Sequence, residues 1–66
     1  MIGTVWHYDE RMQRGYIIGH NNQRYDFSRI DYRNAQDPPE GSMVEFTVAV
    51  GKVAKNITKT QQKALW

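Results

Sequence analysis

The sequence contains no cysteine, so neither a disulfide bond nor a thiolate zinc site can add to the stability of its core. Its two histidines are too few to form a metal site by themselves, and we expect no metal and no cofactor. A chain of 66 residues buries only about 60% of the surface that its unfolded form exposes, so its core must be small. A five-stranded closed or nearly closed sheet is a common solution for so short a chain.

Long apolar runs are also missing. No stretch approaches the roughly 20 apolar residues of a membrane helix. The first residues lack the basic region followed by an apolar region that marks a signal peptide. We therefore expect a soluble, cytoplasmic protein that makes no membrane contact through this segment, and the absence of cysteine agrees with a reducing compartment.

Acidic residues are absent from the last third of the chain. The part through Glu45 carries five arginines and seven acids, whereas four lysines and no acid follow Phe46. A basic end favours polyanionic partners such as nucleic acids. A solvated strand and tail account for these lysines equally well.

β-Branched and aromatic residues predict five short strands, and turn residues separate them. In the second strand, Tyr16 and Ile18 share one face while Ile17 points to the other. Strict alternation in the fourth strand predicts inward Val44, Phe46 and Val48. The predicted strands are Ile2–Tyr8, Gly15–Gly19, Gln23–Phe27, Met43–Val50 and Val53–Thr58.

The segment 28–41 has no sustained period and contains Pro38, Pro39 and Gly41, which predicts a long loop with a helical turn near its start. The strands and this loop predict an all-β domain over residues 1–59, a small antiparallel Greek-key barrel, although an SH3-like barrel uses similar ingredients. Residues 60–66 are expected to be a flexible tail or the start of a linker. The expected core residues are Val5, Ile17, Val44, Phe46, Val48 and Ile57.

Five segments stand in order along the chain: GTVWHYD (3–9), RGYII (14–18), YDFSRI (25–30), EGSMVEF (40–46) and AKNIT (54–58). They resemble G-x-V-K-W-F-N, the first ribonucleoprotein motif K-G-[FY]-G-F-I, the second motif V-F-V-H-[FY]-S-A-I from its third position, E-G-Q-x-V-x-F and A-x-N-V-T. These are motifs of the cold-shock domain family. The resemblance covers nearly the whole chain and implies an OB-fold that binds single-stranded RNA or DNA.

The departures from the family pattern fall on the face with which the family stacks bases. In this alignment His7 replaces a tryptophan, Ile18 an aromatic residue, Arg24 a phenylalanine and Asp26 a histidine. A local bulge would instead give the tryptophan role to Trp6, and both alignments stay open.

The resemblance implies one set of nucleic-acid-binding residues. Aromatic side chains stack on bases at about 1–3 kcal/mol each, and an arginine stacks its guanidinium plane or pairs with a phosphate. For Tyr16 and Phe27 the alternative is that they cover the barrel, and for Tyr32 that it packs locally. Arg14 can equally be a solvated turn charge, and Arg24 can form a surface ion pair with Asp26, since the two lie two residues apart and face the same way. The predicted set is Trp6, His7, Tyr8, Arg14, Tyr16, Ile18, Arg24, Phe27 and Tyr32.

The resemblance thus predicts low-specificity binding of single strands with modest affinity, and two other functions are alternatives to it. An OB-fold that has lost most of its stacking residues can serve protein interaction or regulation, for instance as the first domain of a longer protein. Enzymatic activity is not expected, because no nucleophile is paired with a base and no catalytic residue or small-molecule substrate is indicated.

Overall fold

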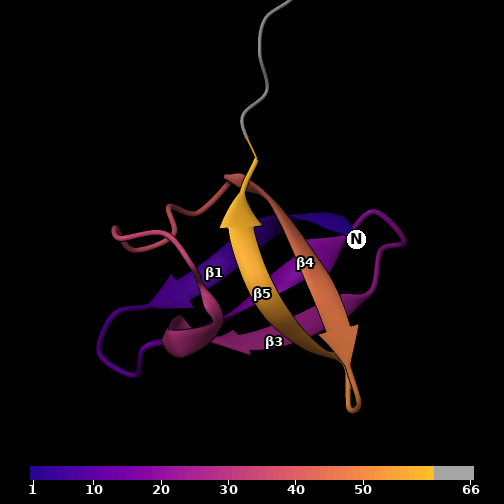
Figure 1. Cartoon of the computed structure of the whole chain (residues 1–66), viewed down its shortest axis with the longest axis horizontal. Coiled ribbons are helices and arrows are strands. Elements are labelled where there is room, and N and C mark those ends of the chain that lie inside the picture. The colour runs from indigo at the N-terminus through magenta and orange to yellow at the C-terminus, as the bar shows by residue number, and fades with distance from the viewer. Residues whose placement is uncertain (61–66) are drawn as a thin grey trace, which may run out of the picture.

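Five strands and one short 3-10 helix form the structure, a computed structural model that describes residues 1–60 (Figure 1). Every strand end lies within one residue of its predicted position, and the helical turn lies where it was expected. The expected tail lies outside the described residues except for Thr60. The elements are β1 (Ile2–Asp9), β2 (Arg14–Gly19), β3 (Arg24–Ser28), η1 (Arg29–Asp31), β4 (Met43–Ala49) and β5 (Val53–Lys59).

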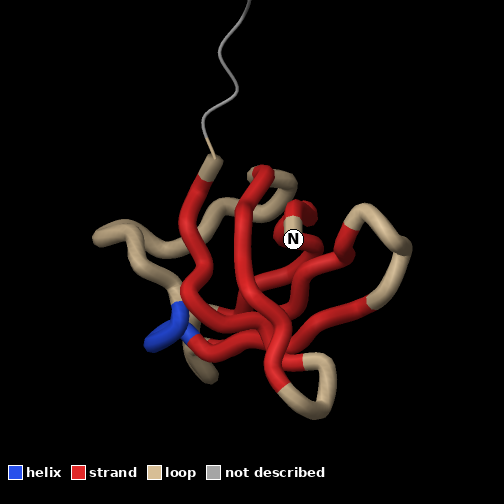
Figure 2. The backbone as a smooth tube through the Cα atoms, turned by 45° about the vertical axis from the view of Figure 1, so that its right-hand side comes forward, coloured by secondary structure: helices blue, strands red, loops and turns tan. Residues whose placement is uncertain are grey.

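The strands close into a barrel in the order β1-β2-β3-β5-β4, with β4 pairing back onto β1. Figure 2 shows the strands coiling around one interior, with the loops outside. The predicted all-β five-stranded barrel is therefore confirmed, and it is OB-fold-like. The pairing is not antiparallel throughout, because β3 and β5 run parallel where Asp26 pairs with Val53. A second parallel bridge joins Tyr32 to Ile57.

The core contains five of the six residues expected there and excludes Val48. Val48 is 47% exposed. It is the next-to-last residue of β4, close to the β4–β5 turn, and this hairpin extends beyond the rest of the barrel at the bottom of Figure 1. A side chain near the tip of a hairpin has fewer neighbours than one in the middle of the barrel. The hydrophobic core consists of Val5, Ile17, Tyr25, Phe27, Tyr32, Val44, Phe46, Ala54 and Ile57.

A β-bulge in β1 changes which residues of that strand face inward. Val5 pairs with Ile17 and His7 with Tyr16, so Trp6 is an extra residue opposite no partner. Both Trp6 and His7 are exposed, whereas the next residue, Tyr8, packs against the core. The bulge that was one of the two possible alignments is therefore present. It leaves both candidates for the tryptophan role, Trp6 and His7, exposed.

A second bulge interrupts β5 where the sequence pattern is weakest. Glu45 pairs with Thr58 and Thr47 with Lys55, which leaves one extra residue on β5. Asn56 has a φ of 51°, a left-handed conformation that asparagine adopts more readily than most residues. Because of this extra residue, Ile57 turns inward and is fully buried.

The structure gives Gly15 and Gly41 backbone roles. A Cβ at Gly15 would collide with the carbonyl oxygen of His7 across the β1–β2 pair. Gly41 has a φ of 89°, which favours glycine. Gly15, Gly41 and Asn56 all lie in the motifs that resemble the family. The backbone geometry of the fold accounts for the residue type at each of these positions without any ligand.

Ile17 and Ile18 provide a matched test of the β2 register. Ile17 is fully buried and Ile18 is half-buried on the outer face. We expect Ile17→Val to cost about 0.5–1.5 kcal/mol of unfolding free energy, because it removes a methyl group from a packed core. Ile18→Val removes the same group and should stay within about 0.5 kcal/mol of the wild type. Urea and thermal unfolding measure both, and equal losses would contradict the register.

Candidate nucleic-acid interface

The outer face of β1, β2 and β3 brings together side chains from three separate segments. Tyr16 in the central strand lies opposite His7 on one side and opposite Asp26 on the other, and Ile18 lies opposite Arg24. Directly opposed residues have their side chains on the same face of a sheet. The register therefore brings the rings of Tyr16 and His7 together with the cation of Arg24 and the carboxylate of Asp26.

An open hollow of about 360 Å³ lies over this group. It combines aromatic, cationic, acidic and apolar side chains, and its mouth is wide. Four of the predicted binding residues line it. Its lining consists of His7, Asp9, Met12, Arg14, Gly15, Tyr16, Arg24 and Asp26.

Arg24 covers one side of the Tyr16 ring. Its guanidinium carbon lies 4.0 Å from the ring centroid, and its Nε donates a hydrogen bond of 3.2 Å to Oδ1 of Asp26. A cation–π contact at an exposed site contributes about 0.5–1 kcal/mol, and an exposed ion pair about 0–1 kcal/mol. The guanidinium thus lies over the ring of Tyr16, and the Arg24 side chain remains 62% exposed.

His7 lies on the other side of Tyr16, with the two ring centroids 5.9 Å apart and the planes tilted by 42°. Its Nδ1 is 3.0 Å from Oε2 of Glu40. The same carboxylate oxygen accepts a hydrogen bond of 3.2 Å from the backbone N–H of Tyr8. Glu40 therefore ties the end of β1 to the end of the long loop and positions the imidazole beside the hollow.

Trp6 and Arg14 flank this group. Trp6 is 61% exposed at the bulge and is not part of the hollow's lining. Arg14 begins β2 and is exposed at the rim. Within residues 1–60 it forms no salt bridge, so its charge is available to an anion.

Phe27 and Tyr32 are not on this face. Phe27 is 2% exposed and Tyr32 is 5% exposed, and both belong to the core. The prediction that Phe27 stacks on bases is therefore wrong, because its ring fills the barrel. Tyr8 is half-buried and stacks on Phe27, with centroids 6.0 Å apart and an angle of 13° between planes. The rings of Tyr8 and Phe27 therefore pack together behind this face.

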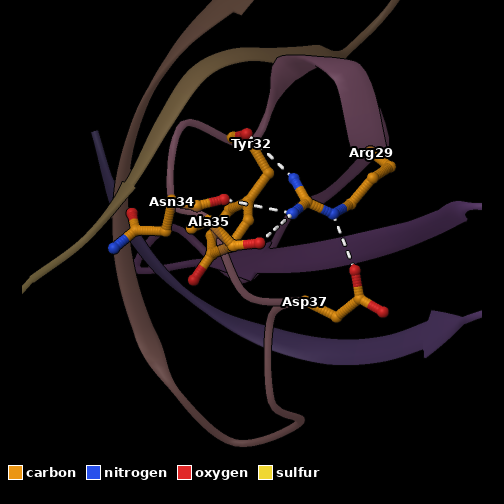
Figure 3. A network of polar contacts seen from close by, with 5 residues as sticks. All are labelled: Arg29, Tyr32, Asn34, Ala35 and Asp37. Carbon is orange, nitrogen blue, oxygen red and sulfur yellow. Dashed lines mark hydrogen bonds and ion pairs between the residues drawn. The ribbon is translucent and has the colours of Figure 1, made fainter.

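Arg29 organises the long loop (Figure 3). Its Nε donates to Oδ1 of Asp37 at 2.7 Å, and its two terminal nitrogens donate to the carbonyl oxygens of Tyr32, Asn34 and Ala35 at 3.0–3.1 Å. The side chain is mostly buried in this network. Arg29 therefore serves the loop structure, and Arg24 is the arginine that neutralises Asp26.

The predicted binding set lacks Asp9, Met12 and Glu40, yet all three contact the site. Asp9 and Met12 line the hollow from the β1–β2 turn, where Oδ1 of Asp9 accepts hydrogen bonds from two backbone N–H groups. A turn signal predicts such capping but not which side of the turn a hollow occupies. Glu40 is far from His7 in sequence, and no local pattern indicates their contact.

Comparison with known proteins adds no family assignment. No family model matches the chain, and no characterised protein sequence matches it. Within residues 1–60, no cluster of three or more potential ligands is placed to hold a metal ion, and no helix is long and apolar enough to span a membrane. The likeness to the cold-shock family thus rests on the motifs themselves.

Two tyrosines have raised pKa values. Burial raises the pKa of Tyr32 above 10.0, although the nearby Arg29 opposes this rise. Burial, and then the negative charge of Asp37, raise the pKa of Tyr8. The folded state therefore favours the neutral phenols more than the unfolded state does. This stabilisation is complete below pH 10.0 and is lost as the pH rises through the raised pKa values.

We accordingly expect the unfolding free energy to fall above pH 10.0, and to fall less in Tyr32→Phe, which has no phenol to ionise at that position. Urea unfolding between pH 8 and pH 11 measures this, with lysine deprotonation common to both proteins. Identical alkaline losses in the wild type and Tyr32→Phe would contradict the assignment.

Proposed function

We propose that this chain is a single-stranded nucleic-acid-binding module of the cold-shock type. The observation that carries the proposal is the group at Tyr16: two exposed or half-exposed rings, the guanidinium of Arg24, and Arg14, which forms no salt bridge within residues 1–60. All lie on one open face of an OB-fold-like barrel. The ordered motifs along the chain support the same family. OB-folds bind single strands by combining stacking rings with a positively charged path.

The stacking surface is composite. Arg24 already covers one side of Tyr16, so a base on that side meets a planar guanidinium backed by an aromatic ring. Arginine stacks on π-systems because its charge is delocalised over a plane that is only weakly hydrated. This arrangement partly replaces the aromatic residue that the family motif has at position 24.

Affinity should be modest. Ile18 offers apolar contact in place of a ring, and Phe27 is enclosed in the core. Each absent stack removes about 1–3 kcal/mol of binding free energy. Little sequence specificity is expected from stacking, since every base has a π-face.

A protein-binding role is the second candidate. It is favoured by exposed apolar side chains outside the hollow, at Ile30, Val48 and Val50. A chain that binds a partner protein through these residues and ignores oligonucleotides would support this candidate over the first.

Substitutions at Tyr16 test the stacking directly. We expect Tyr16→Leu to weaken binding of a short pyrimidine-rich single strand roughly 5- to 150-fold, because it removes one stack. Tyr16→Phe keeps the ring and should bind nearly as the wild type does. Fluorescence titration in a Trp66→Phe background, where Trp6 is the sole tryptophan, measures the affinity. NMR shifts at low salt locate the contact, and no perturbation around Tyr16 would contradict the proposal.

Salt dependence tests the role of Arg14. For single strands, log affinity falls with log salt with a slope of about −0.7 per neutralised phosphate. We expect Arg14→Ala to make the slope shallower by about 0.7 and Arg14→Lys, which keeps the charge, to leave it unchanged. Titrations at four salt concentrations measure the slopes. If Arg14→Ala leaves the slope unchanged, Arg14 neutralises no phosphate and its proposed role is contradicted.

A further inference from the structure

The hollow contains two carboxylates, and only one of them is committed to the fold. Oδ1 of Asp9 accepts hydrogen bonds from the backbone N–H groups of Arg11 and Met12 and so caps the turn. Asp26 is 58% exposed, and its side chain is bound at Oδ1 by Arg24. Among residues 1–60, no hydrogen bond is donated to its Oδ2. Asp26 therefore presents acceptors to the hollow.

A carboxylate accepts hydrogen bonds and donates none, and it has about four lone-pair sites. Arg24 uses one of them. The remaining lone pairs of Asp26 can accept hydrogen bonds from a partner that has two adjacent N–H donors. A partner whose edge presents acceptor oxygens is repelled by the carboxylate.

The Watson–Crick edges of the bases differ in this respect. Guanine presents N1–H and the N2 amino group side by side, which matches the two oxygens of one carboxylate. Uracil and thymine present a single N3–H between two carbonyl oxygens, which a carboxylate repels. Adenine and cytosine present one amino donor beside a ring-nitrogen acceptor and are intermediate.

We propose that Asp26 makes this surface prefer guanine over uracil or thymine for the base that stacks at Tyr16. The inference rests on the proposed function. Tyr16 and Asp26 are directly paired across β2 and β3, so a base lying on the ring group has its edge within reach of the carboxylate. The Asp26 oxygen that Arg24 does not bind is an acceptor, so it suits the donors of a base edge and not a phosphate oxygen. The phosphates run instead along the side of Arg14.

The test compares binding of the hexanucleotides UUUUUU and UUUGUU. The second contains a single guanine, so that the strand does not fold on itself through guanine–guanine contacts. We expect the wild type to bind UUUGUU about fivefold tighter or more, the lower end of the discrimination by a bidentate side chain–base pair. UUUIUU, whose inosine lacks the N2 amino group, should fall between the two. This comparison requires no variant and so does not depend on any variant's folding.

Asp26→Asn gives the matched reversal. Its amide replaces one acceptor with a donor that opposes a guanine donor, so the ratio of the two affinities should fall to about one or below. Glu45→Gln removes the same charge from an exposed site on β4. It should leave the ratio unchanged, even though both variants strengthen binding of any oligonucleotide by reducing repulsion.

The outcomes separate the two proposals. If the wild type binds both hexamers equally or prefers UUUUUU, or if Asp26→Asn keeps the preference for guanine, the inference is overturned and the proposed function stands. If the wild type binds neither hexamer at low salt, the proposed function fails and the inference fails with it.

Discussion

The extra residue in β1 is the constraint on which the candidate interface depends. Up to Val5 the odd-numbered residues of β1 face the core, and after the bulge at Trp6 the inward position passes to Tyr8. Without the bulge, strict alternation would turn His7 toward the interior and Tyr8 toward the solvent. The bulge thus joins an imidazole to the outer group around Tyr16 and supplies a ring to the core beneath it.

Aromatic residues are divided between the core and the outer face, and the small size of the barrel explains the division. Tyr25, Phe27 and Tyr32 fill the interior together with Phe46. A domain of this length has few positions that can be fully buried, so large rings contribute much of its apolar burial. On the outer face, the guanidinium of Arg24 lies over the ring of Tyr16.

The arginines show how position decides the role of a charge. Arg29 is mostly buried and satisfies three carbonyl oxygens and a carboxylate, which holds the long loop in one shape. Arg24 lies on the surface against a ring and Asp26, and Arg14 stands at the rim without a salt bridge inside residues 1–60. The outer face therefore carries both signs of charge.

Local patterns were sufficient to determine the strand boundaries, the loop and most of the core, because alternation and turn residues act over a few neighbours. Only the tertiary structure decided that Phe27 faces inward, that Val48 is uncovered at a hairpin tip and that Glu40 reaches His7. Each of these depends on what other strands place opposite the residue. A bulge shifts the phase of a strand without changing its composition, and burial depends on partners that lie far away in the sequence.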